Sequence, residues 1–177
     1  YQVYTSFEDV TQEYEAKEKL KESHRIGKMG RWDYYHKKDI LQFTEGVFNI
    51  LELAPEKLEA TYLGYLKKIH PDDRKKAAQE WEEALDNHQP YDAEYRLLLT
   101  DGRVKWIASH CYTEYDEDGH PTHSVGIVQD ITEQKQKQEE LEQFFSVNLD
   151  LLCIADTDGR FIKLNKEWEK TLGYSRE

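Results

Sequence analysis

The sequence contains little cysteine and no long apolar run. Among its 177 residues only Cys111 and Cys153 are cysteines, and no Cys-x-x-Cys pair occurs. Neither a disulfide framework nor a thiolate zinc site is indicated, and the default expectation is a reducing, cytoplasmic compartment. No apolar run approaches the roughly 20 residues that a helix needs to cross a bilayer. We therefore expect no membrane contact by this segment.

Basic residues are fewer than acidic residues. Lys and Arg total 24 against 36 Asp and Glu, which gives a formal net charge of −12. Such a surface repels phosphate backbones and anionic lipids, so nucleic acid is not an expected partner. Hydrophobic residues make up 38% and charged residues 34%, as in soluble globular chains. At roughly 100–150 residues per domain, the length holds one full domain with a remainder.

An internal repeat accounts for the remainder. Asp9-Val10-Thr11 is echoed by Asp130-Ile131-Thr132, and Leu51 is echoed by Leu172, both at an offset of 121 residues. A register sustained to the end of the sequence predicts a piece of a tandem array, cut out of phase with its domains. The predicted parts are the last strand of a preceding copy (1–11), a linker helix (12–26), a complete domain (24–132), a second linker helix (133–145) and the start of a following copy (146–177).

Both predicted linkers are rich in Glu, Lys and Gln at spacings that support a helix. Their apolar stripe is thin, and two interpretations stay open: a solvated helix lying on its own domain, or the seam of a homodimer. Sheet edges are a second candidate for self-association. Residues 1–11 and the hairpin expected at 151–164 are complementary pieces of one sheet, and unpaired edges favour association.

The complete domain is predicted as α+β. Residues 31–35 and 40–43 indicate a hairpin, and the strands expected at 91–99, 104–115 and 123–131 follow three helices. We expect Thr44 and Thr61 to cap the first two helices, and Pro71 to begin a third that ends near His88. On the second helix, Tyr62, Tyr65, Leu66 and Ile69 share one face. The order gives a five-stranded antiparallel sheet with short helices on one face.

Five sequence marks, in this order, resemble the PAS family, specifically the PAS/PAC sensor modules of bacterial sensor histidine kinases and diguanylate cyclases. They are Ile26–Trp32, His70–Arg74, Tyr95-Arg96, the hairpin signal Asp101-Gly102 followed by Trp106-Ile107, and Gly126–Glu133. The resemblance implies a sheet whose inner face and short helices enclose a small-molecule pocket or a packed core. It also implies a non-catalytic input module for a downstream output domain, such as a histidine kinase or a cyclic-dinucleotide enzyme.

In the strand expected at 91–99, alternation puts Ala93, Tyr95 and Leu97 on the apolar side and Asp92 and Glu94 on the other. This alternation, the family pattern and the buried faces of the first two helices together give eleven candidate pocket residues. A ligand pocket and a plain core predict the same set, so both readings stay open; Ser109 and Gly126 are expected to leave space beside Tyr62 and Tyr65. The candidate pocket residues are Phe48, Tyr62, Tyr65, Leu66, Tyr95, Leu97, Ile107, Ser109, Cys111, Gly126 and Val128.

Flavin and haem are both disfavoured as cofactors. The flavin-binding relatives carry a reactive Cys in a motif that the segment between Leu51 and Ile69 lacks, and Val128 stands where they present a Gln. Haem needs an axial His, and the stripe from Tyr62 to Ile69 has none. His120 and His123 lack a third ligand nearby in sequence, so no metal site is predicted.

No catalytic residue is predicted, because the sequence shows no Gly-rich phosphate loop and no Ser-His-Asp arrangement. The other candidate site is the junction between the last strand and the second linker, formed by Asp130 and Thr132 with Arg96 and Trp106 as neighbours. Thr132 is expected to cap the linker helix, and Asp130 to accept a hydrogen bond or ion pair from a neighbouring group, with Arg96, Lys105 and Trp106 as the candidates. The runner-up function is a ligand-free dimerisation scaffold.

Overall fold

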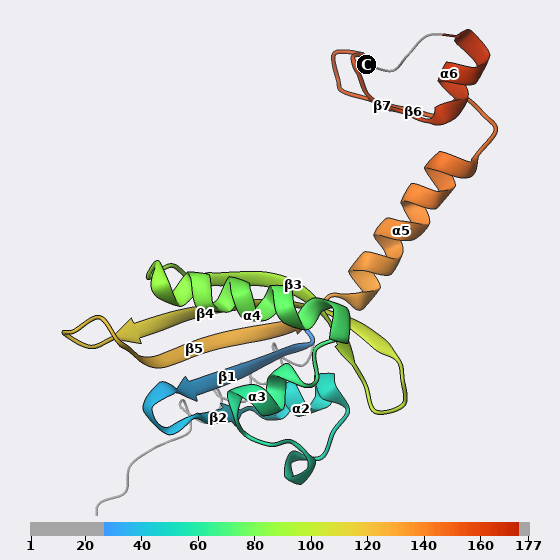
Figure 1. Cartoon of the computed structure of the whole chain (residues 1–177). Helices are drawn as coiled ribbons and strands as arrows, with labels where there is room; N and C mark the ends of the chain where they lie inside the picture. The colour runs from blue at the N-terminus through green and yellow to red at the C-terminus, as the bar shows by residue number, and fades with distance from the viewer. Residues whose placement is uncertain (1–26, 174–177) are drawn as a thin grey trace, which may run out of the picture. The chain divides into compact units, whose positions relative to one another are not determined.

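The computed structural model describes residues 27–173, in two compact units that divide after Ile131 (Figure 1). The strand predicted at 1–11 and the linker predicted at 12–26 lie outside the described residues. In the described part of the chain, no helix is both long and apolar enough to span a membrane.

The first unit is built on one antiparallel sheet. Its strands run in the spatial order β2-β1-β5-β4-β3, so the last strand of the unit lies beside the first. The strands are β1 (Met29–Tyr35), β2 (Ile40–Phe43), β3 (Tyr91–Leu98), β4 (Val104–Tyr115) and β5 (Pro121–Asp130). The predicted five-stranded α+β architecture is confirmed.

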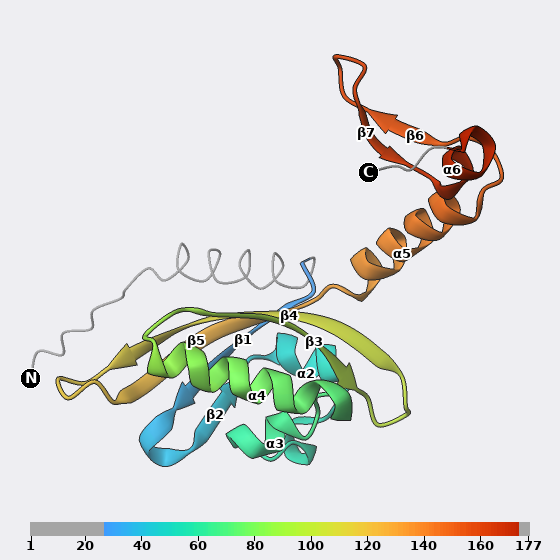
Figure 2. The ribbon, with the colours of Figure 1, turned by 45° about the horizontal axis from the view of Figure 1, so that its top comes forward.

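The helices cover one face of this sheet (Figures 1 and 2). Side chains alternate as predicted: Ala93, Tyr95 and Leu97 of β3 are buried against the helices, whereas Asp92 and Glu94 are exposed. The helical elements are the short 3-10 turns η1 (His36–Lys38) and η2 (Pro55–Lys57) and the helices α2 (Glu45–Leu51), α3 (Tyr62–Leu66) and α4 (Pro71–Asp86).

The two predicted threonine caps behave differently. Thr61 Oγ1 accepts the N–H of Gly64 (3.1 Å) and caps α3 as expected. Thr44 stands at the N-cap position of α2, but its side chain makes no cap bond. Its hydroxyl instead accepts the N–H of Arg31 (2.9 Å) and donates to the Arg31 carbonyl (3.1 Å). Thr44 therefore ties the start of α2 to β1.

Two helix ends come earlier than predicted. Helix α4 ends at Asp86, and His88 has a left-handed backbone (φ 53°) that ends the run. Helix α3 ends at Leu66, so Ile69 lies outside it and forms an isolated bridge with Leu97 of β3. Ile69 nevertheless stays buried on the predicted face.

The second unit consists of α5 (Thr132–Val147), a hairpin of β6 (Cys153–Ala155) and β7 (Phe161–Leu164), and α6 (Lys166–Leu172). Helix α5 covers the predicted second linker. Its apolar residues Leu141 and Phe144 are 65% and 62% exposed. This thin, exposed stripe matches the sequence pattern. Both predicted contacts of the helix, with its own domain or with a second copy, stay open.

The structure repeats at the offset seen in the sequence. Strand β7 begins 121 residues after β2, and α6 begins and ends 121 residues after α2. The helix-start residues Thr44 and Asn165 keep the same offset. Asn165 Oδ1 accepts the N–H of Leu152 (3.1 Å), as Thr44 accepts that of Arg31. The two segments therefore share their backbone tie as well as their element order.

Candidate functional site

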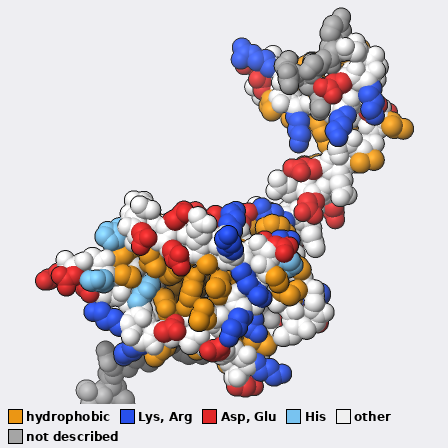
Figure 3. All heavy atoms as spheres, viewed as in Figure 1, with side chains coloured by type: hydrophobic (Ala, Val, Ile, Leu, Met, Phe, Trp, Pro, Cys, Tyr) orange, Lys and Arg blue, Asp and Glu red, His pale blue; other side chains and the backbone are white. Residues whose placement is uncertain are grey.

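A cavity of about 50 Å³ lies in the first unit between the inner face of the sheet and helices α3 and α4. Figure 3 shows apolar side chains gathered on this face of the unit, between α4 and α3. Eight of the thirteen lining residues are aromatic, and none carries a formal charge. The lining residues are Trp32, Tyr34, Leu41, Phe43, Tyr62, Tyr65, Leu66, Ile69, Ala77, Trp81, Tyr91, Tyr95 and Ser109.

The cavity brings together five of the eleven nominated residues: Tyr62, Tyr65, Leu66, Tyr95 and Ser109. The other six stand elsewhere in the interior, with Phe48 half-buried and the rest buried. They are Phe48, Leu97, Ile107, Cys111, Gly126 and Val128. The cavity thus occupies only the part of the inner face that lies under α3 and α4.

Gly126 does not leave space, contrary to the expectation from its size. It pairs with Cys111 on one neighbouring strand and with Trp32 on the other. A Cβ at Gly126 would lie 2.5 Å from the His110 carbonyl oxygen and 2.6 Å from both the Cys111 Cβ and the Trp32 ring. The indole of Trp32 therefore fills the room that the missing side chain provides.

The sequence interpretation missed most of the aromatic wall. Trp32 and Tyr34 alternate onto the inner face of β1, and Trp81 lies on the buried stripe of α4. The Trp81 ring is central: its centroid lies 5.9 Å from Trp32, 6.2 Å from Tyr62 and 5.2 Å from Tyr91. Period-two alternation in β1 was the available signal, but only tertiary packing shows that β1 and α4 face the same cavity.

The polar groups of the lining residues are tyrosine hydroxyls, the Ser109 hydroxyl and two indole N–H groups. Tyr65 and Tyr95 share a hydrogen bond of 3.0 Å, and burial raises the pKa of both. Burial, with a smaller effect of Glu82, raises the pKa of Tyr62 to about 12. The Tyr62 hydroxyl is buried and has no hydrogen-bond partner. Among the described residues, every other buried side-chain N or O atom has one. Such an orphaned group marks a place for a polar guest.

A buried hydrogen-bond chain flanks the aromatic wall. His36 Nε2 lies 2.7 Å from the hydroxyl of Ser124, which lies 2.7 Å from that of Thr113. The His36 ring stacks on Trp81 with centroids 6.2 Å apart. Burial, followed by repulsion from His123, lowers the pKa of His36. His36 is therefore neutral at pH 7 and adds no charge to the wall.

Lys105 joins three elements at the end of the sheet. Its ammonium donates to the Ile50 carbonyl (2.8 Å) and pairs with Glu52 Oε1 (2.9 Å) and Asp130 Oδ2 (3.5 Å). The Lys105 and Asp130 side chains are only 16% and 14% exposed, so this network is partly shielded from solvent. Lys105 is one of the three partners expected for Asp130, and its contacts extend to the C-terminal end of α2.

The other two junction candidates contact different groups. Arg96 binds Asp73 in a two-pronged pair (2.9 and 2.6 Å), and its guanidinium lies 5.8 Å from the ring centroid of Trp106. Hydrogen bonding from Arg96 is the main cause that lowers the pKa of Asp73 to about 2. The Trp106 carbonyl accepts the N–H of Ile131 (2.9 Å). Arg96 therefore anchors the start of α4, while Trp106 holds the sheet exit.

Helix α5 begins at Thr132. Thr132 is therefore the first residue of the helix, whereas the sequence predicted it as the cap residue that precedes the helix. Glu133 lies in the first turn, as expected, and pairs with Lys137 (2.7 Å). Helix α5 thus begins one residue after Ile131, whose amide is held by β4.

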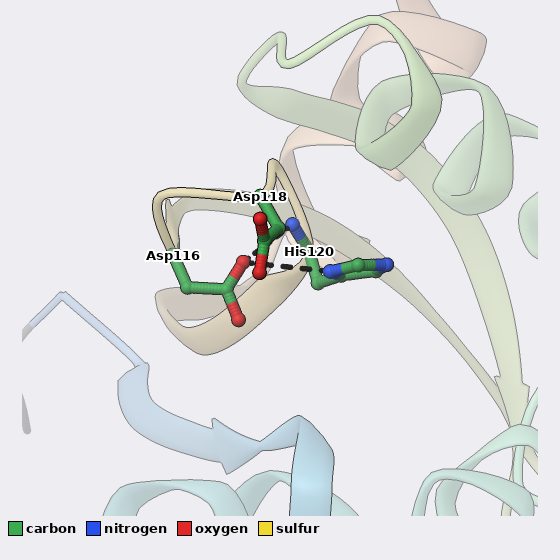
Figure 4. A group of neighbouring side chains, drawn as sticks. All are labelled: Asp116, Asp118 and His120. Atoms are coloured by element: carbon green, nitrogen blue, oxygen red, sulfur yellow. Dashed lines mark hydrogen bonds and ion pairs between the residues drawn. The ribbon is translucent and has the colours of Figure 1, made fainter.

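Asp116, Asp118 and His120 gather in the β4–β5 turn, with one possible ligand atom each within 4.8 Å of the others (Figure 4). The turn explains Asp116 without a metal, because Asp116 Oδ1 accepts the N–H of His120 (2.9 Å). Asp156 does the same for Arg160 (2.8 Å) in the β6–β7 turn, where no His is present. His123 lies apart from His120 and pairs with Asp33 (3.1 Å).

The cavity size limits what it can enclose. Pockets that bury drug-sized ligands measure about 300–1,000 Å³, whereas this one measures about 50 Å³. None of the residues that line the cavity is a His, the side chain that most often ligates haem iron. The chemistry fits a guest of a few heavy atoms, or a small head group, with ring faces and one free hydroxyl to meet it.

Comparison with known proteins identifies the family. The family described as PAS fold matches residues 40–128, half of the chain, and a second described as PAS domain matches residues 149–177. Among curated relatives, uncharacterized protein y4lL of Sinorhizobium fredii is 34% identical over 53% of this chain and 12% of its own length. The probable diguanylate cyclase DgcE of Escherichia coli is 24% identical over 90% of this chain and 15% of its own.

The chain therefore spans about an eighth to a sixth of the length of these relatives. Among solved structures, a sensory box histidine kinase/response regulator from Burkholderia thailandensis superimposes with a TM-score of 0.60. It is 24% identical, and the alignment covers 70% of this chain and 92% of that one. That likeness shows the shared fold, and with the family match over the cavity-bearing unit it leads to one conclusion: the chain belongs to the PAS family of sensory modules.

Proposed function

We propose that the first unit senses a small molecule in the aromatic cavity and passes its occupancy to helix α5. The observation that carries this proposal is the hydroxyl of Tyr62, a residue that lines the cavity; this hydroxyl is buried and has no protein partner. Leaving a buried hydroxyl unpaired destabilises a fold by about 1–3 kcal/mol. A guest that hydrogen-bonds to it recovers this energy, and the recovered energy is available to bias conformation.

The route from cavity to helix is short. Ser109 lines the cavity, and Ile107, two residues earlier on β4, pairs with Asp130 of β5. Asp130 is held by Lys105, and Ile131 by the Trp106 carbonyl. A guest that displaces β4 therefore acts on the two groups that fix the sheet exit, immediately before α5 begins.

The output lies beyond this chain. We place the module in an intracellular signalling protein with consecutive PAS copies, because the β2–α2 segment recurs as β7–α6 at the same offset and a PAS description matches residues 149–177. The names of the relatives favour a histidine kinase or a diguanylate cyclase as the output domain. The described residues would then act without catalysis, as an input to that domain.

The runner-up is a ligand-free dimerisation scaffold. One observation favours it: Tyr112 and Ile127 stand exposed on the outer face of the sheet, at 69% and 36%. Exposed apolar side chains at the centre of a sheet favour contact with a second copy or with a linker helix. Dimerisation and ligand sensing do not exclude one another, because the outer face of the sheet and the cavity are separate surfaces.

Native mass spectrometry of the whole chain tests the sensing function. We expect the purified wild-type chain to retain or capture a small molecule, and Ser109→Val to lose it, because the branched side chain extends into the cavity. Ala108→Val, on the neighbouring residue of the opposite face, is the matched control and should retain the molecule. Equal retention by all three chains would assign the bound mass to another site, and a bare chain under every condition would favour the scaffold.

A further inference from the structure

The aromatic cavity has the chemistry of a cation site. Eight ring-bearing residues line it, and none of the lining side chains has a formal charge. Trp81 stands at the centre, within 5.2–6.2 Å of the Trp32, Tyr62 and Tyr91 ring centroids. Ring faces carry negative electrostatic potential, and groups of such rings recognise ammonium head groups.

The charged groups near the cavity also favour a cation over an anion. Glu80 and Glu82 of α4 are smaller causes, after burial, of the raised pKa of Tyr91 and of Tyr62, and Glu80 also pairs with Lys76 (3.6 Å). The nearest ring that could bring positive charge is His36, which stacks on Trp81, and burial keeps it neutral at pH 7. An anion would therefore meet repulsion in this cavity, and a cation would meet attraction.

We propose that the cavity binds the ammonium head group of a small organic amine, with the rings of Trp81 and its neighbours around the charge and the Tyr62 hydroxyl oxygen accepting an N–H. This proposal rests on the sensing function proposed above and names its ligand class. The cavity volume is about 50 Å³, which is a few times the roughly 10–15 Å³ that one water needs on the same measure. It admits a head group of a few heavy atoms, whose remainder extends toward the surface.

A matched pair of probes separates charge from size. Trimethylammonium and 2-propanol have the same number of heavy atoms and a similar branched shape, but only the first is a cation. We expect the full chain to bind trimethylammonium at least about tenfold more tightly than 2-propanol, measured from the indole N–H shifts of Trp32 and Trp81 in NMR titrations at constant ionic strength. Equal affinities, or saturation by the alcohol alone, would overturn the cation site and leave small-molecule sensing intact.

The Tyr62 hydroxyl is tested by one conservative variant. Tyr62→Phe keeps the ring, so we expect about a fivefold loss of trimethylammonium affinity and no change for tetramethylammonium, which has no N–H to donate. Tyr112→Phe, on the exposed outer face, should change neither. Equal losses for both ammonium ions would refute the hydrogen bond. Absence of saturable binding by any probe, together with a bare chain in the mass spectrum, would reject the cation site and the sensing function alike.

Discussion

Gly126→Ala is expected to lower the free energy of unfolding by at least about 3 kcal/mol, because the added methyl group has nowhere to go. It would lie 2.5 Å from the His110 carbonyl oxygen, which is backbone and cannot rotate away, and 2.6 Å from the Trp32 ring. Relief requires β4 and β5 to separate or the indole to swing into the cavity. Urea denaturation of the two chains measures the difference.

Gly102→Ala is the control for this substitution. Gly102 has a left-handed backbone (φ 87°) but open space around the added Cβ, so only conformational strain of about 1 kcal/mol is expected. A Gly126→Ala chain as stable as Gly102→Ala would mean that the Trp32 indole does not occupy the place described, and the account of the cavity wall would need revision.

Lys105→Met is expected to destabilise the first unit by about 3 kcal/mol, because it removes the cation that pairs with both Asp130 and Glu52 in a partly shielded network. Methionine keeps the length of the aliphatic stem, so packing changes little. The Ile50 carbonyl and Glu52 lose the same donor. Thermal or urea unfolding of the variant measures the effect.

Arg103→Met is the matched control. Arg103 pairs with the same Glu52 but its side chain is 59% exposed, and an exposed ion pair contributes little to stability. We expect near wild-type unfolding for this variant. Equal destabilisation by both substitutions would show that the network acts through Glu52 alone, and would remove Lys105 from the path between α2 and the sheet exit.

Local patterns predicted the sheet well. The alternation in β3 gave the correct buried set of Ala93, Tyr95 and Leu97, and the Asp101-Gly102 turn signal lies between β3 and β4. These features depend on neighbouring residues and on backbone preferences that the sequence carries directly. The cap at Thr61 succeeded for the same reason.

The failures depend on tertiary contacts. Thr44 has the right residue type and position for a cap, yet the nearby Arg31 backbone takes its hydroxyl. The missing side chain of Gly126 suggests open space in the sequence. In the structure this space is filled by Trp32, which lies 94 residues earlier in the chain. Trp32, Tyr34 and Trp81 join one cavity only after β1 and α4 pack together. No local pattern reports which distant side chain fills a given gap.

Amide hydrogen exchange at Ile131 tests most directly whether the cavity controls the start of α5. The Ile131 N–H is bonded to the Trp106 carbonyl (2.9 Å), so its protection reports the hold of β4 on the sheet exit. Filling the cavity with Ser109→Val should change this protection by about fivefold or more, equivalent to about 1 kcal/mol, while Ala108→Val leaves it unchanged. Identical protection in wild type and both variants would contradict the account, because a filled cavity would then leave no mark on the residue from which α5 departs.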